Sequence, residues 1–216
     1  MSAFRMAVAL LAALAATAAL AQEVAPGGRR ASRPGKPAWE FALTAYPTQV
    51  RNGDDTTSAI AVADRGPLHL EARYGYETKD SRSAFAGWTF SGGDTVTWEL
   101  TPLVGGGWGP VRAFIPGLEA SLVWEKLDFY VEAEFVRDRE DGSASYNYAW
   151  SELGYRPLEW LRIGAVGQRT RAYGGEREFQ RGPFAQVTWG RFTIGGFWFN
   201  PGSGDQVFVG SIGIAF

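Results

Sequence analysis

From Ala38 to the C-terminus, apolar residues alternate with polar or small residues in short segments separated by turn-forming residues. Because successive side chains of a β-strand point to opposite faces, this period of two predicts strands. No stretch of this region has the convincing period of an amphipathic helix. The sequence therefore predicts an all-β, antiparallel fold. The clearest segment alternates Leu68, Leu70, Ala72 and Tyr74 with His69, Glu71 and Arg73.

The same alternation fits two architectures, which differ in the face of the strands that points to the interior. A soluble sandwich buries the apolar face, whereas a transmembrane β-barrel turns that face toward lipid and keeps polar residues in its lumen. Aromatic residues near the strand ends favour the barrel, because Trp and Tyr concentrate at membrane interfaces. The candidates for such aromatic girdles are Trp39, Tyr76, Trp88, Trp98, Trp124, Trp150, Tyr155, Trp160, Trp189 and Trp198.

The segments predict twelve strands, with ten as the alternative because the second and fourth segments are the weakest. Connections after even-numbered strands are short, such as 64–67 and 156–158, while those after odd-numbered strands are longer, such as 104–116 and 137–144. Bacterial barrels have short periplasmic turns and longer outer loops, so we expect both termini in the periplasm. We also expect the glycines of 104–109 to let the third outer loop fold tightly, in a way that can turn it inward over the mouth. The predicted strands are 38–46, 57–63, 68–76, 83–91, 95–103, 117–125, 127–136, 145–155, 159–169, 179–189, 191–199 and 206–216.

The first residues have the pattern of a cleavable secretory signal peptide. Arg5 supplies a positive charge, an Ala/Leu-rich stretch follows, and Ala19-Leu20-Ala21 is a small-residue cleavage site. The next residues combine Pro, Gly and basic side chains without periodicity, which predicts a disordered periplasmic tail. We therefore expect a signal peptide at 1–21, the tail at 22–37 and a transmembrane β-barrel at 38–216.

The final segment, VFVGSIGIAF, ends in phenylalanine and has apolar residues at alternate positions before it. Together with the signal peptide and the alternating segments, it resembles the porin-like outer-membrane β-barrel class of Gram-negative bacteria. The resemblance covers 38–216 as architecture and implies a location in the cell outer membrane, in contact with its lipid. It also implies that the barrel-assembly machinery recognises the last strand, although Gly210 departs from the pattern. The assembly signal would consist of Phe208, Ile212, Ile214 and Phe216.

Functional residues are expected on the inward face, because the lipid face of a barrel is apolar. Carboxylates gather there on neighbouring strands about 4.8 Å apart, so they repel one another unless cations lie opposite. Arg73 and Arg162 are the best-placed cations, and Arg112 is a further candidate from a loop. The sequence does not decide which face of the eighth segment points inward. Trp150 and Glu152 share one face, so either both contact lipid or both line the lumen. The predicted lumen-lining residues are His69, Glu71, Arg73, Glu99, Glu119, Asp128, Glu132, Glu134 and Arg162.

Composition excludes several classes of function. Lys plus Arg total 21 and Asp plus Glu total 23, for a net charge of −2, which excludes a strongly basic surface for nucleic acid. The absence of cysteine excludes disulfides and thiolate sites. His69 is the only histidine, and no serine lies two residues from it, so a lipid hydrolase is the least favoured function. We predict no enzyme, and no catalytic, cofactor-binding or metal-binding residues.

Two functions fit the sequence. The first is a monomeric outer-membrane barrel that acts as a narrow passive channel, with inward charges that select small polar solutes. The second is a structural or adhesive barrel whose lumen is closed by salt bridges. A continuous water path through the lumen would favour the channel, whereas Arg–carboxylate pairs that cross the lumen would favour the closed barrel.

Overall fold

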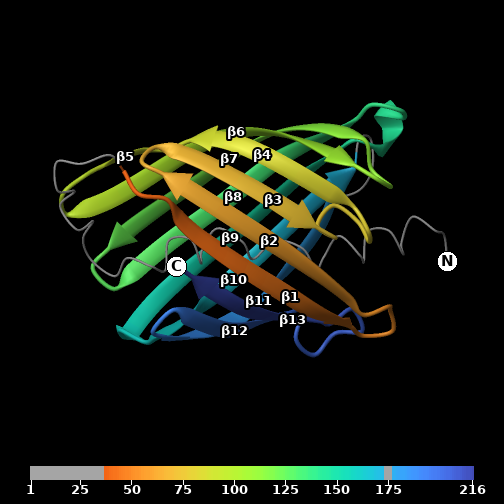
Figure 1. Ribbon diagram of the computed structural model, residues 1–216. Helices are drawn as coiled ribbons and strands as arrows, with labels where there is room; N and C mark the ends of the chain where they lie inside the picture. The colour runs from red at the N-terminus through yellow and green to blue at the C-terminus, as the bar shows by residue number, and fades with distance from the viewer. Residues whose placement is uncertain (1–36, 173–176) are drawn as a thin grey trace.

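The computed structural model describes residues 37–172 and 177–216, and regular structure in this part of the chain is almost entirely β-strand (Figure 1). The predictions for residues 1–21 and 22–36 lie outside these ranges. No helix among the described residues is long and apolar enough to cross a membrane. The elements are β1 (Glu40–Val50), β2 (Thr56–Arg65), β3 (Leu68–Tyr74), β4 (Arg82–Trp88), β5 (Phe90–Gly92), β6 (Val96–Trp108), β7 (Ala113–Trp124), β8 (Leu127–Asp138), the 3-10 turn η1 (Gly142–Ala144), β9 (Tyr146–Leu158), β10 (Leu161–Ala172), β11 (Arg177–Trp189), β12 (Phe192–Phe199) and β13 (Val207–Ala215).

The strands form one antiparallel sheet that closes on itself (Figure 1). Nearly every strand pairs with its neighbours in sequence, and two further pairings, β1 with β13 and β4 with β6, complete the ring. The short β5 follows β4 after a break at Thr89 and pairs with β6, so β4 and β5 together make one strand of the wall. The thirteen segments therefore form a twelve-stranded barrel. The prediction of twelve antiparallel strands is confirmed, and the ten-strand alternative is wrong.

Connections alternate in length around the barrel and so distinguish its two ends. Those after even positions in the wall, such as 66–67 and 125–126, have two or three residues, while 75–81, 139–145 and 200–206 at the other end are longer. We call these the short-turn end and the long-loop end. The first residue of β1 and the last of β13 lie at the short-turn end. The predicted alternation is therefore present, and the periplasmic position of this end stays a prediction.

Residues 104–108 of the Gly-rich stretch 104–109 are part of the wall, and only Gly109 lies in a loop. Strand β6 continues to Trp108, and only 109–112 connect it to β7. A Cβ atom at Gly105 would collide with the ring of Phe85 on the neighbouring β4. The prediction that residues 104–108 belong to the third outer loop was therefore wrong, because Gly105 makes room for a cross-strand aromatic side chain rather than for a turn.

Strands β1 and β13 pair from Ala42 with Ala215 to Val50 with Val207, and Phe216 extends this pairing by one step to Phe41. The Phe41 amide donates to the Phe216 carbonyl at 2.8 Å, and the Phe216 amide donates to the Phe41 carbonyl at 2.9 Å. The two rings stack with their centroids 5.7 Å apart. Both rings are exposed on the outer surface, so the stacked pair covers the junction between β1 and β13 from outside.

The two faces of the wall have opposite chemistry. Large apolar side chains such as Leu153, Ile194 and Ile212 are exposed on the outer surface, while polar and charged side chains are buried inside, together with a cluster of apolar and aromatic side chains. An apolar exterior around an interior that buries charged and polar groups is the arrangement of a membrane-spanning barrel. Most of the girdle candidates are exposed, namely Trp39, Trp88, Trp98, Trp124, Tyr155, Trp160, Trp189 and Trp198. The prediction was wrong for Tyr76 and Trp150, which are buried in the lumen at 3% and 0% exposure.

Candidate functional site

The lumen is strongly acidic. In the described part of the chain, six glutamates are buried inside the barrel but only two arginines are. The side chain of His69 is buried there as well. Such an imbalance is costly in a dry interior, so each carboxylate needs a hydrogen-bond donor, a cation or water. The buried glutamates are Glu71, Glu77, Glu119, Glu132, Glu134 and Glu152, and the buried arginines are Arg73 and Arg162.

Arg73 crosses the lumen from β3 to carboxylates on β8. Its Nη1 atom lies 3.1 Å from Oε1 of Glu132 and 2.8 Å from Oε1 of Glu134. Its Nε also contacts Oε1 of Glu71 on the same strand. Since β4, β6 and β7 separate β3 from β8 around the wall, this side chain spans the interior and does not follow the wall. We call Arg73, Glu71, Glu132 and Glu134 the Arg73 cluster.

Aromatic side chains hold the Arg73 guanidinium in place. It lies over the rings of Tyr76 and Phe85, 4.2 Å from each centroid, which is a favourable cation–π distance. The Tyr76 hydroxyl also donates to Oε1 of Glu132 at 2.8 Å. The guanidinium is therefore fixed between rings and carboxylates, and the space left by Gly105 allows Phe85 to lie there.

Arg162 forms a second cluster nearer the short-turn end. Its Nε donates to Oδ1 of Asp128 at 2.9 Å, and its Nη1 donates to Oε2 of Glu152 at 2.5 Å and to Oε1 of Gln186 at 2.7 Å. A Cβ atom at Gly154 would lie 2.5 Å from Asp128 Oδ1 and 2.6 Å from Arg162 Nε. Glycine at that position is therefore required for the ion pair. We call Arg162, Asp128, Glu152 and Gln186 the Arg162 cluster.

An aromatic cluster fills the space beside Arg162. The indole of Trp150 is fully buried and packs edge-on against Phe197 and Phe199 of β12, with centroids 5.3 and 5.4 Å away. Its Nε1 donates to Oε1 of Glu152 at 2.8 Å. The ring of Phe184 lies under the Arg162 guanidinium at 4.6 Å. Together with the Arg73 cluster, these side chains constrict the lumen.

The remaining wall of the lumen carries few charges and mixes apolar with neutral polar side chains. Amide and hydroxyl side chains line the inner face of β10 to β13 and of β1 and β2, opposite the acidic strands β7 to β9. Such groups both donate and accept hydrogen bonds, so this wall suits polar solutes without selecting their charge. Its buried members include Gln168, Gln180, Gln186, Thr193, Ser211, Thr44, Thr48 and Ser58.

The predicted lumen-lining residues lie on the inward face, with different degrees of burial. His69, Glu71, Arg73, Glu119, Glu132, Glu134 and Arg162 are buried, and Glu99 and Asp128 are partly buried. Glu99 belongs to neither cluster. Sequence reasoning missed Glu77 and left Glu152 open, although Trp150 and Glu152 both face the lumen. Arg112 was wrong, because its side chain is 68% exposed and pairs with Glu140 in the outer loops.

Comparisons with known proteins bear on the fold. No protein-family model matches the sequence, and no curated protein matches it. Among solved structures, a KdgM porin in complex with disordered oligogalacturonate aligns with a TM-score of 0.61 at 9% identity, covering 81% of this chain and 99% of that chain. A second structure of a KdgM porin has a TM-score of 0.58 at 10% identity and covers 81% and 98%. The fold is that of an outer-membrane β-barrel.

A larger porin is similar only in part. OccK8 (OprE) of Pseudomonas aeruginosa aligns with a TM-score of 0.44 at 11% identity, over 82% of this chain and 67% of that chain. At 9% and 10% identity, the alignments with the two KdgM structures show the fold alone. What the lumen does must therefore be argued from its own residues.

Proposed function

We propose that the chain is a narrow outer-membrane channel for small polar solutes, and that it favours cations and neutral molecules over anions. The observation that carries this proposal is the charge of the lumen, with six buried glutamates against two arginines. A core built only for stability gains little from such charges, because replacing buried ion pairs by packed apolar side chains is often neutral or stabilising. Carboxylates along a path instead attract cations and repel anions.

The acidic wall also limits what can be transferred from the KdgM structure. The porin there is in complex with oligogalacturonate, a sugar chain that bears carboxylates. The glutamates of this lumen would repel such a chain. On the opposite wall, Oε1 of Gln180 and Nε2 of Gln186 have no hydrogen-bond partner within the described residues, and they would bind the hydroxyl groups of a neutral or amino sugar. We therefore propose small neutral or cationic solutes, and not the ligand of that porin.

The outer surface of the barrel and the lengths of its connections support a position and an orientation in the membrane. The exposed apolar face would contact outer-membrane lipid, and the short-turn end, with both ends of the barrel domain, would face the periplasm. The closed ring buries its own strand edges, which supports a monomer. The barrel-assembly machinery is the partner that would read the last strand.

A flux assay in vesicles tests the proposal. The refolded chain is placed in lipid vesicles, and swelling is followed with a neutral sugar, its amino derivative and its carboxylate derivative, which have similar sizes. The amino and neutral sugars should enter faster than the sugar acid. Fastest entry of the sugar acid would contradict the proposed selectivity, and no entry of any solute would contradict the channel.

A structural barrel with a closed lumen is the second candidate, and the crossing contacts of Arg73 favour it. Its Nη1 bridges from β3 to Glu132 and Glu134 on β8, which narrows the path. Parallel measurements on Arg73→Met distinguish the two functions. Flux through the unmodified chain supports the channel, whereas flux through neither protein supports the closed barrel. A lipid hydrolase is disfavoured because His69 is only 6% exposed and lies inside the wall, away from lipid.

A further inference from the structure

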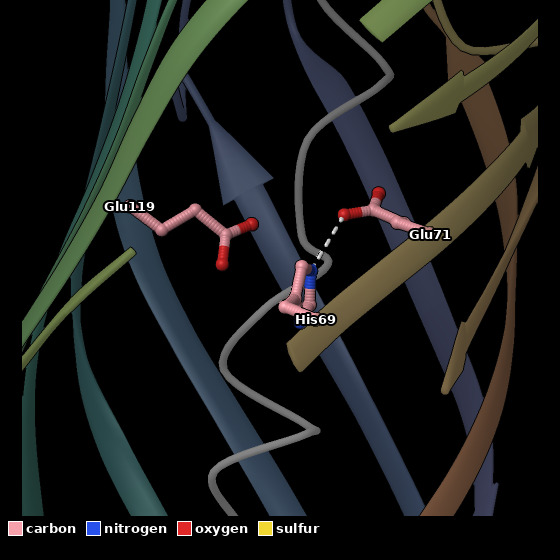
Figure 2. Close-up of side chains that lie close together, drawn as sticks. All are labelled: His69, Glu71 and Glu119. Atoms are coloured by element: carbon pink, nitrogen blue, oxygen red, sulfur yellow. Dashed lines mark ion pairs between the residues drawn. The ribbon is translucent and has the colours of Figure 1, made fainter. Parts of the chain in front are cut away.

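Three potential metal ligands meet inside the barrel near its short-turn end. His69 and Glu71 lie on β3, and Glu119 lies on β7. One ligand atom from each lies within 4.8 Å of the others. Figure 2 shows the Glu119 carboxylate reaching from the opposite strand toward the imidazole and the Glu71 carboxylate. Because β4 and β6 separate β3 from β7, the residues converge across the lumen and are not simple neighbours on the wall.

His69 is oriented as a metal ligand would be. Its Nδ1 lies 2.8 Å from Oδ1 of Asp64, so a proton on Nδ1 leaves the lone pair of Nε2 free. That Nε2 atom is buried and has no hydrogen-bond partner. A histidine that donates one ring N–H to a carboxylate and turns the other nitrogen to a cation is the usual arrangement in metal sites.

Glu119 supplies the second independent observation. Glu119 is only 7% exposed, and its Oε1 has no hydrogen-bond partner. It also lies directly opposite Glu132 in the β7–β8 register, which adds repulsion between like charges. Arg73 is engaged by Glu71, Glu132 and Glu134. A cation between Glu119 and His69 would satisfy this buried oxygen.

The distances fit a first-row transition metal. Bonds of about 2.0–2.1 Å place tetrahedral ligands about 3.3 Å apart. Nε2 of His69 and Oε2 of Glu71 are already 3.5 Å apart. The other oxygen of Glu71, Oε1, pairs with Arg73, which leaves Oε2 available on the side of His69. The ligand atoms of all three residues lie within 4.8 Å of one another, so the Glu119 carboxylate would have to move closer to complete a site of this size. A nitrogen ligand favours such a metal over Ca²⁺ or Mg²⁺, which prefer all-oxygen sites.

We propose that His69, Glu71 and Glu119 bind one divalent transition-metal cation, with Asp64 as the residue that positions His69. Two carboxylates and a neutral imidazole balance the charge of the cation, and the fourth position would hold water. The ion would join β3 to β7 across the lumen. The proposal does not need the barrel to conduct, so its failure and that of the proposed channel are separate results.

Titration of the refolded full chain with ZnCl₂ tests the proposal. The chain has one histidine and no cysteine, so with a histidine-free purification tag no other imidazole or thiolate competes. We expect one Zn²⁺ per chain by calorimetry, and binding at least about tenfold weaker in His69→Ala and in Glu119→Gln. Glu77→Gln is the matched control, because Glu77 is an equally buried lumen glutamate outside the site, and its affinity should be unchanged.

A spectroscopic measurement on the unmodified chain keeps the proposal testable if a variant fails to fold. With ¹⁵N-labelled histidine, only the imidazole of His69 contributes, and Zn²⁺ should shift its Nε2 resonance and leave Nδ1 protonated. Chelation should reverse the shift. Absence of Zn²⁺ binding, an unchanged imidazole spectrum, or unchanged affinity in folded His69→Ala would each overturn the assignment.

Discussion

Replacing Arg73 by methionine removes the cation that joins three buried carboxylates while keeping a side chain of similar length. Breaking a buried ion pair by removing one partner costs about 3–5 kcal/mol, because the other charge is left uncompensated. Arg73 contacts Glu71, Glu132 and Glu134 and is itself 3% exposed, so we expect the free energy of unfolding to fall by this amount. A loss of about 3 kcal/mol lowers the ratio of folded to unfolded protein by more than about a hundredfold.

The assay is reversible denaturant unfolding of the refolded barrel, followed by tryptophan fluorescence. Arg112→Met is the matched control, because that arginine pairs with Glu140 at the surface, where both side chains are about two thirds exposed, and should cost about 0–1 kcal/mol. Adding Glu132→Gln and Glu134→Gln to Arg73→Met should restore at least half of the lost stability, since two of the three carboxylates that lost their cation are then neutral. A cost below about 1 kcal/mol for Arg73→Met would refute the reasoning, because water would then be compensating the carboxylates.

Three further substitutions test other parts of the account. Gly154→Ala places a Cβ atom against Asp128 and Arg162 and should cost about 1–3 kcal/mol in the same unfolding assay; no loss would mean that the Arg162 cluster is loose. Trp150→Ala removes a fully buried ring and should lower stability by about 3–5 kcal/mol and raise single-channel conductance; unchanged conductance would place the constriction elsewhere. Phe216→Ala removes the ring stacked on Phe41 and should slow insertion by purified assembly machinery, measured as the heat-modifiable fraction; normal insertion would contradict the proposed assembly signal.

The sequence was sufficient to predict the wall of the barrel but not the contacts inside it. A period of two determines which residues share a face, and this gave the strand order and the inward position of residues such as Arg73 and Arg162. It does not determine which strands face one another across the lumen. The choice of Glu132 and Glu134 as partners of Arg73 depends on barrel size and register, which appear only when the ring is closed.

The wrong predictions have local physical causes. Trp150 was a girdle candidate by residue type, with the face of its segment left open, and its indole donates to Glu152 and packs on aromatic rings across the lumen. The glycines of 104–109 suggested a loop, yet Gly105 leaves space for Phe85 within the wall. The meeting of His69 with Glu119 could not be predicted either, because it depends on the curvature of the wall between β3 and β7.

The central claim is that the acidic lumen forms a path for small polar solutes. The most direct test is the reversal potential of the refolded chain in a planar bilayer that separates two KCl concentrations. With six buried glutamates against two arginines, the account predicts a small conductance whose reversal potential has the sign of K⁺ selectivity. A reversal potential with the sign of Cl⁻ selectivity, or no conductance at any voltage or salt concentration, would contradict it.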